Sequence, residues 1–123
     1  MTSDEILALK LGRELDALVA EKVMGWFLDS DIGYWRNESG LCKRQDKWSP
    51  SEDISAAWEV VEEMGDCLHL RQHGEQGEWE AWFCGYPNSK AHGETAPEAI
   101  CKASLLAVTG EALVNELPGT NQC

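Results

Sequence analysis

Apolar residues in the first segment, Ser3 to Met24, recur at spacings of three and four. This spacing places them on one face of an amphipathic helix. Gly25 follows directly, and glycine is common just past the end of a helix. The pattern therefore predicts one continuous helix from Ser3 to Met24. Its apolar face would consist of Leu7, Leu11, Leu15, Leu18, Val19 and Val23.

A capping-box pattern predicts the start of a second helix at Ser49-Pro50-Ser51-Glu52. It has a capping serine, proline at the first helical position and glutamate at the third. An apolar stripe follows and ends near Met64-Gly65. We expect Trp58, on this stripe, to be a core residue. The other members of the stripe are Ile54, Ala57 and Val61.

The same pattern recurs at Thr95-Ala96-Pro97-Glu98 and predicts a third helix. Small residues after this box indicate close packing against a sheet or another helix. We expect a break at Gly110, a continuation to Leu117 and an end at Pro118-Gly119, because glycine and proline both interrupt helices.

Alternating apolar and polar positions predict an antiparallel hairpin between these helices. Its strands would run from Cys67 to His73 and from Glu78 to Tyr86. Lys90–Gly93 is a candidate third strand. Trp79 and Trp82 lie three apart on one strand and therefore point to opposite faces. Both are buried only if both faces of the sheet are covered; otherwise one lines a cleft.

Residues 26–48 form the irregular part of the chain, with Gly33 and Gly40 as breakers. Gly33–Arg36 and Leu41–Arg44 can pair as a short hairpin around residues 37–40. We find no repeat and no linker in the chain. The prediction is therefore a single domain over residues 1–123.

Composition narrows the class of protein. The 123 residues include 10 Lys and Arg against 22 Asp and Glu, a net charge of −12, with 43% hydrophobic residues. Such a chain folds into a globular core, and its charge argues against non-specific binding to nucleic acid or to an anionic membrane. No apolar stretch reaches the ~18 residues of a membrane span, and the early acidic residues do not resemble a signal peptide.

The five cysteines are odd in number and 17 to 25 residues apart. A disulfide framework or a zinc ribbon usually has closer pairs. We therefore expect reduced thiols and a cytoplasmic protein. Cys67, His69 and His73 share one strand face and could hold zinc, but no second cluster completes the ligand set. The prediction is surface histidines without a metal or cofactor.

Three stretches resemble the phage ABA-sandwich domain family: RELDALVAEKVMGW at 13–26, DISAAWEVVEEM at 53–64 and ETAPEAICKASLLAV at 94–108. The resemblance implies an α+β fold, an α-β-α sandwich with a small antiparallel sheet of about three strands. It also implies a bacteriophage or prophage protein acting in the cytoplasm of an infected bacterial host. The family has no assigned enzymatic activity, so no catalytic residue follows from it.

Charge along the chain suggests a ligand site. Residues 52–80 hold nine acids and one base, whereas residues 34–48 hold four bases and two acids, interleaved with aromatic residues. Aromatic faces stack on bases, and cationic side chains pair with phosphate. The segment is therefore a candidate pocket for a small nucleotide-like anion, with Trp26 supporting its base and Arg71 as a weaker contact.

The alternative is a solvated loop whose tryptophans fold back on the core as a lid. The predicted ligand-binding residues are Trp26, Tyr34, Trp35, Arg36, Arg44, Trp48 and Arg71.

The leading hypothesis is a non-enzymatic phage protein that sequesters a nucleotide-derived signal of host immunity. It rests on the phage resemblance, on the basic aromatic segment 34–48, and on the lack of a nucleophile motif, P-loop or dinucleotide fingerprint. A rival hypothesis assigns the acidic block to a protein–protein inhibitor or DNA mimic of a host defence factor. A third is an accessory protein of purely structural role. Apolar residues at both ends would be covered in a homo-oligomer; they are Leu7, Leu9, Leu113 and Val114.

Overall fold

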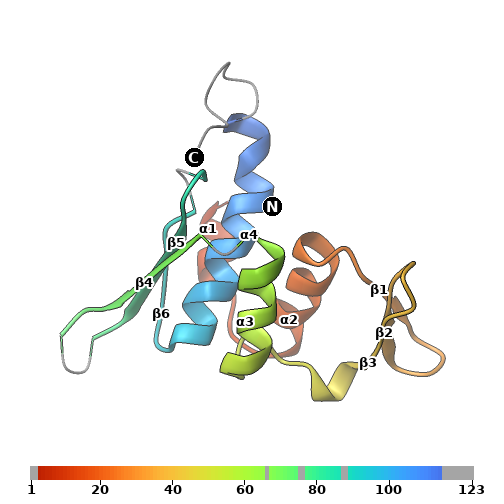
Figure 1. Cartoon of the computed structure of the whole chain (residues 1–123). Helices are drawn as coiled ribbons and strands as arrows, with labels where there is room; N and C mark the ends of the chain where they lie inside the picture. Colours follow the sequence, from red (N-terminus) through yellow and green to blue (C-terminus); the bar gives the residue numbers. More distant parts are fainter. Residues whose placement is uncertain (1–2, 66, 75–76, 87–88, 115–123) are drawn as a thin grey trace.

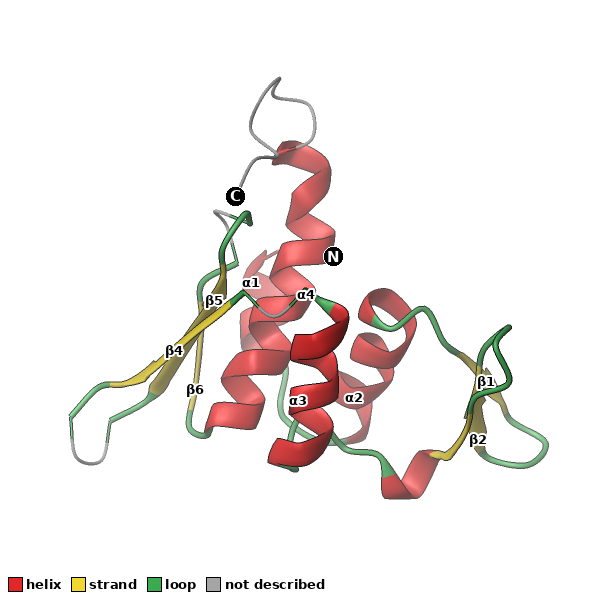
Figure 2. Cartoon of the chain, viewed as in Figure 1, coloured by secondary structure: helices red, strands yellow, loops and turns green. Residues whose placement is uncertain are grey.

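The computed structural model describes residues 3–65, 67–74, 77–86 and 89–114 (Figures 1 and 2). The helical segments are α1 (Ser3–Ala8), α2 (Arg13–Leu18), the π-helical turn η1 (Val19–Val23), the 3-10 turn η2 (Gln45–Lys47), α3 (Ile54–Glu63) and α4 (Ala96–Val114). The strands are β1 (Phe27–Asp29), β2 (Tyr34–Arg36), β3 (Cys42–Arg44), β4 (Leu68–Gln72), β5 (Trp79–Phe83) and β6 (Ala91–Gly93).

Helix α4 lies at the centre of the fold. One side contacts β5 and β6 of the antiparallel sheet β4–β5–β6, and other sides contact α1, α2, η1 and α3. Figure 1 shows α4 between that sheet and α3. The predicted hairpin and third strand are confirmed, and so is the α+β class.

A second antiparallel sheet, β1–β2–β3, lies on the far side of the helices from the first (Figure 2). The predicted hairpin around residues 37–40 is confirmed, since Trp35 pairs with Lys43. The sequence did not predict β1, which pairs Leu28 with Trp35. Strand alternation points Trp35 toward the core, where its exposed fraction is 2%.

The prediction of one helix from Ser3 to Met24 is wrong at residues 9–12, where the chain leaves α1 and enters α2. Gly12 adopts a φ of 124°, which favours glycine, and its N–H donates to Ser51 Oγ at 2.9 Å. A partner 39 residues away therefore fixes the break. Leu11 is exposed as a result, whereas Leu15 is buried.

The predicted start of the second helix is also wrong. Residues 49–52 form a turn in which the Asp53 N–H donates to the Ser49 carbonyl at 2.8 Å. Helix α3 begins at Ile54, with Asp53 as the cap accepting from Ser55 N–H at 3.2 Å. The buried face is Ala56, Ala57, Val60 and Val61.

Trp58 is therefore not a core residue, contrary to the prediction. It is 50% exposed, and Ile54, one helical turn earlier, is 49% exposed. Both lie at the edge of the buried face of α3, since helical periodicity places them beside Ala57 and Val61. The helix presents an apolar ridge to solvent.

Helix α4 begins where its capping box predicts, because Thr95 Oγ1 accepts from Glu98 N–H at 3.3 Å. The expected break at Gly110 is wrong, since the helix continues to Val114. Leu117 and Pro118-Gly119 lie outside the described residues. So do the side chains of Leu113 and Val114, and the homo-oligomer stays a prediction.

A disulfide joins Cys67 and Cys84, so the expectation of reduced thiols is wrong at this pair. Cys67 directly precedes β4 and Cys84 directly follows β5, with Cα atoms 5.5 Å apart, a normal disulfide spacing. Sequence spacing could not show this, because the pairing depends on strand register. Cys42 and Cys101 are free thiols, and Cys123 lies outside the described residues.

The thiol of Cys101 is buried inside α4, and burial raises its pKa well above 9.0, with the carboxylates of Asp16 and Glu98 adding to the effect. It is therefore protonated and poorly suited to act as a nucleophile. None of the helices in the described ranges has the length and apolar character needed to cross a membrane.

Candidate functional site

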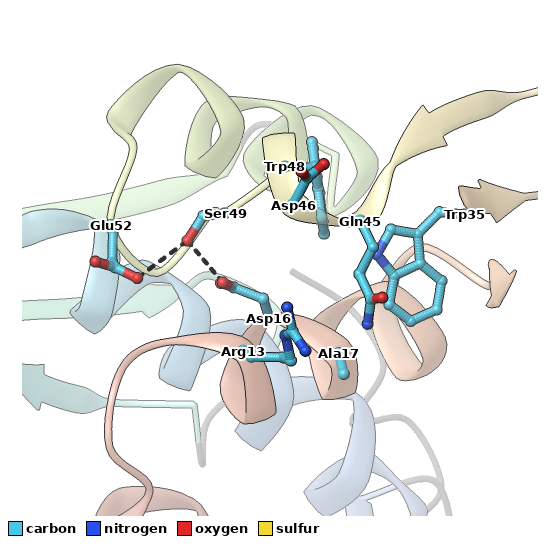
Figure 3. A pocket seen from close by; sticks show the side chains of 9 residues that line it. All are labelled: Arg13, Asp16, Ala17, Trp35, Gln45, Asp46, Trp48, Ser49 and Glu52. Atoms are coloured by element: carbon cyan, nitrogen blue, oxygen red, sulfur yellow. Dashed lines mark hydrogen bonds between the residues drawn. The ribbon is translucent and has the colours of Figure 1, made fainter. Parts of the chain in front are cut away.

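A cavity of about 220 Å³ lies between α2 and the segment that runs from β2 through η2 to the turn before α3 (Figure 3). Its wall combines residues from three stretches that are distant in sequence. The lining residues are Arg13, Asp16, Ala17, Trp35, Gln45, Asp46, Trp48, Ser49 and Glu52. We refer to this cavity as the Trp35–Trp48 pocket.

Tryptophans build the core side of this pocket. Trp35 and Trp48 are 2% and 4% exposed, and Trp26 packs against Trp48 with ring centroids 4.6 Å apart. The tryptophans of residues 26–48 thus fold back on the core, as the alternative hypothesis expected. Trp35 and Trp48 also border the pocket. The same two side chains therefore pack in the core and line a cavity that can hold a ligand.

The indole nitrogen of Trp48 is buried and has no hydrogen-bond partner among the described residues. A buried donor left unpaired costs about 1–3 kcal/mol. Native proteins usually satisfy such groups through protein, water or a ligand. An acceptor placed beside this nitrogen would therefore recover this free energy.

Asp16 anchors the polar wall. Its Oδ1 accepts from Ser51 N–H at 2.8 Å and its Oδ2 accepts from Ser49 Oγ at 2.6 Å. Figure 3 shows the Ser49 hydroxyl between Asp16 and Glu52, the latter at 3.4 Å. These bonds hold the turn before α3 against α2, and they occupy the carboxylate of Asp16.

The other charged residues of the pocket differ in whether another side chain already pairs with them. Asp46 is paired with Arg44 at 2.9 Å. Arg13 is exposed at the pocket and makes no ion pair within the part of the chain that the structure describes. Arg13 is thus the cationic group free to meet a ligand.

The structure separates the predicted ligand-binding residues. Trp35 and Trp48 line the pocket and Trp26 supports Trp48. Arg36 pairs with Asp29 at 3.6 Å and, like Tyr34 and Arg44, alternates to the other face of its sheet from Trp35.

Arg71 belongs to a different sheet, on β4. Sequence reasoning missed the other seven lining residues of the Trp35–Trp48 pocket, Arg13 among them. No local pattern distinguishes Arg13 from other exposed residues on its helix.

A second polar group lies on the outward face of β4–β5–β6. Glu80 is 4% exposed and accepts from Arg71 Nε at 2.8 Å, while His73 Nε2 and His92 Nε2 lie 3.2 Å and 3.0 Å from its oxygens. Lys90 Nζ is 3.7 Å away. Burial alone would raise the pKa of Glu80, but the hydrogen bonds from Arg71, His92 and His73 and the charge of Lys90 lower it from 4.5 to about 2.

Trp82 extends this group along the same face. His69 stacks on its ring with centroids 5.0 Å apart and planes within 5°. Lys90 and Arg71 lie 5.0 Å and 5.8 Å from the ring centroid. All three histidines of the chain therefore gather on one open sheet face, and Trp79, on the opposite face, packs against the core.

These features define an α+β protein in which helices separate two small antiparallel sheets. The Trp35–Trp48 pocket lies between α2 and the segment from β2 to the turn before α3. The phage ABA sandwich domain family matches residues 17–105, more than half of the chain. The chain belongs to the phage ABA sandwich domain family. This confirms the resemblance seen in the three sequence stretches.

A similar solved structure is the crystal structure of a phage protein from Bacillus cereus ATCC 14579. It superposes with a TM-score of 0.64 and is 24% identical, and the match covers 82% of this chain and 94% of that one. At this identity the likeness shows the fold alone. A search of curated proteins finds no match.

Proposed function

We propose that this phage protein binds, without converting it, a small nucleotide-derived ligand of host immune signalling in the Trp35–Trp48 pocket. The observation that carries the proposal is the buried indole N–H of Trp48, which has no partner among the described residues and belongs to a pocket-lining side chain. Its hydrogen bond would be completed by an acceptor atom of the ligand.

The size and charge of the pocket favour a particular part of a nucleotide. About 220 Å³ is below the ~300–1,000 Å³ of sites for drug-sized ligands, which suits one base with its sugar. Asp16, Asp46 and Glu52 disfavour phosphate inside the pocket, because like charges repel. The phosphates would lie at the mouth beside Arg13, whose guanidinium is free to pair with them.

The lining residues support binding rather than catalysis. Asp16 already accepts two hydrogen bonds, and Asp46 is held by Arg44. Ser49 donates to Asp16 and has no histidine or lysine beside it in the pocket lining. A serine nucleophile needs such a base. The protein would therefore act by sequestering its ligand.

The proposal is tested by native mass spectrometry of the purified protein with ADP-ribose derivatives and cyclic oligonucleotides. We expect a stoichiometric adduct whose ligand is recovered chemically unchanged. A converted ligand would contradict the non-enzymatic mechanism. The absence of an adduct with every member of the panel would contradict the proposal as a whole and favour a protein partner or a purely structural role.

Replacing Trp48 by phenylalanine should weaken binding of the adduct-forming ligand about three- to tenfold, because Trp48→Phe removes the N–H donor while keeping an aromatic ring. Isothermal titration calorimetry measures the change. Arg13→Ala should also weaken binding, and more so at low salt.

Trp58→Phe and Arg36→Ala are the matched controls, since Trp58 is exposed on α3 and Arg36 lies outside the pocket lining. Both should leave the affinity within twofold. Equal losses in Arg13→Ala and Arg36→Ala would show that binding does not depend on the pocket.

One observation favours the second candidate function, a protein–protein inhibitor. Ile54 and Trp58 form an exposed apolar ridge on α3, and exposed carboxylates lie at both ends of this helix; they are Glu52, Asp53, Glu62 and Glu63. An apolar centre with a charged rim is typical of protein interfaces, with tryptophan a frequent hot spot. The acidic rim would select a partner with a basic surface, such as a DNA-binding host protein.

This function predicts a steep dependence on salt. A host protein retained by the immobilised chain should be released as ionic strength rises, because exposed charge pairs are screened. It should also be lost in Trp58→Ala and kept in Trp48→Phe. Retention that survives high salt and Trp58→Ala would contradict the inhibitor function, whereas ligand binding in the pocket should change little with Trp58→Ala.

A further inference from the structure

We propose that His73, Glu80 and His92 form a binding site for one divalent transition-metal ion on the outward face of β4–β5–β6. The site is separate from the Trp35–Trp48 pocket and does not depend on the function proposed for it. One ligand atom from each of the three side chains lies within 4.8 Å of the others.

Strand register creates this cluster. Glu80, on the central strand β5, is the cross-strand partner of His92 on β6. His73 follows β4, and its N–H donates to the Glu78 carbonyl at 2.9 Å, which holds it beside the start of β5. Three neighbouring segments of the sheet therefore bring the ligands together on one face.

The distances from Glu80 to the two histidines suit a metal of zinc size. Bonds of roughly 2.0–2.2 Å in a tetrahedral site place ligand atoms roughly 3.3–3.5 Å apart. His73 Nε2 and His92 Nε2 lie 3.2 Å and 3.0 Å from the oxygens of Glu80. Both histidine side chains are about half exposed, at 48% and 47%, so small rotations can complete the geometry. The exposed side leaves a fourth position for water.

The ligand set also indicates which metal binds. Two imidazoles and one carboxylate favour Zn²⁺, Co²⁺ or Ni²⁺, whereas Mg²⁺ and Ca²⁺ prefer oxygen ligands alone. Glu80 is a preformed ligand, because burial fixes it and Arg71 donates to its Oε1 at 2.8 Å. Hydrogen bonds of this kind commonly orient ligating carboxylates.

The neighbouring cations limit the affinity. Arg71 and Lys90 both face Glu80, and Lys90 Nζ is 3.7 Å from its Oε2. Their charge opposes a divalent cation. His69 is stacked on Trp82 and is not one of the ligands. The site should therefore bind reversibly rather than hold a structural metal.

The test uses the full chain without a histidine tag, treated with chelator and then titrated with Zn²⁺ and with Co²⁺. Calorimetry should show one Zn²⁺ per chain, and Co²⁺ should give the visible absorption of a low-coordinate nitrogen–oxygen site. His73→Ala and His92→Ala should each weaken binding more than tenfold. Mg²⁺ should not compete.

His69→Ala is the matched control, because it removes an exposed histidine from the same face outside the cluster. It should leave Zn²⁺ affinity within twofold. Lys90→Ala should tighten binding severalfold, since it removes an opposing charge. Equal losses in His69→Ala and His73→Ala, or no saturable binding in the wild type, would overturn the proposal. All these side chains are at least partly exposed, so circular dichroism should confirm an unchanged fold.

Discussion

Replacing Lys102 by alanine should lower the free energy of unfolding by about 3–5 kcal/mol, the largest loss that we expect from any single substitution. Lys102 is 4% exposed, and its Nζ donates to Glu98 Oε2 at 2.8 Å and to the Leu7 carbonyl at 3.0 Å. Without the ammonium group, the carboxylate of Glu98 is buried without its counter-ion, and α4 loses its hydrogen bond to the Leu7 carbonyl of α1. Urea denaturation followed by circular dichroism measures the change.

The surface pair Lys43–Glu59 provides the matched control. Its atoms are 3.2 Å apart, but both side chains are about a third exposed or more, so Lys43→Ala should cost only about 0–1 kcal/mol. The double variant Lys102→Met with Glu98→Gln should be more stable than Lys102→Ala, because no charge is then left unpaired. A cost below about 1 kcal/mol for Lys102→Ala would mean that water already reaches this pair.

Elements that depend on local patterns were predictable from the sequence. Helix α4 begins at its capping box, where Thr95 Oγ1 accepts from the Glu98 N–H. The β4–β5 hairpin follows the alternation of residues 67–86. In both cases the interactions that define the element join residues a few positions apart or across one turn. A short stretch of sequence is therefore enough to predict the element.

Elements that depend on distant partners were not predictable. The helix break before α2 and the late start of α3 share one cause, a set of hydrogen bonds linking Gly12 and Asp16 to Ser49 and Ser51. These partners are 33 to 39 residues apart. Ser49 resembles a helix cap in the sequence, but its hydroxyl donates to Asp16 on α2. The buried face of α3 differs from the predicted stripe, because it includes Ala56 and Val60 in place of Ile54 and Trp58.

The same distinction holds for the candidate sites. Trp35 and Trp48 stand out by residue type, and the pocket does involve them. Arg13 reaches the pocket only through the packing of α2 against the turn before α3. In the sheet β4–β5–β6, His73 could be predicted as a metal ligand from its place at the end of a strand. His92 and Glu80 join it only through the register of β5 with β6. The spacing of residues along the sequence does not reveal that register.

Replacing Asp16 by alanine should lower the free energy of unfolding by about 2–4 kcal/mol and abolish ligand binding in the Trp35–Trp48 pocket. Asp16 is 7% exposed and accepts from Ser51 N–H and Ser49 Oγ. Its removal leaves the N–H of the buried Ser51 without this acceptor and releases the turn that forms one pocket wall. Denaturation and calorimetry on the same preparation measure both effects.

Glu52→Gln separates the two effects, because Glu52 also lines the pocket but is exposed and lies 3.4 Å from the Ser49 hydroxyl. This variant should change stability by less than about 0.5 kcal/mol, as exposed substitutions usually do. Its ligand affinity should stay equal or rise slightly, since a carboxylate near the phosphates is removed. Asp16→Ala protein that is destabilised yet binds the ligand normally would place the ligand elsewhere, because a wall whose anchor is lost cannot keep its shape.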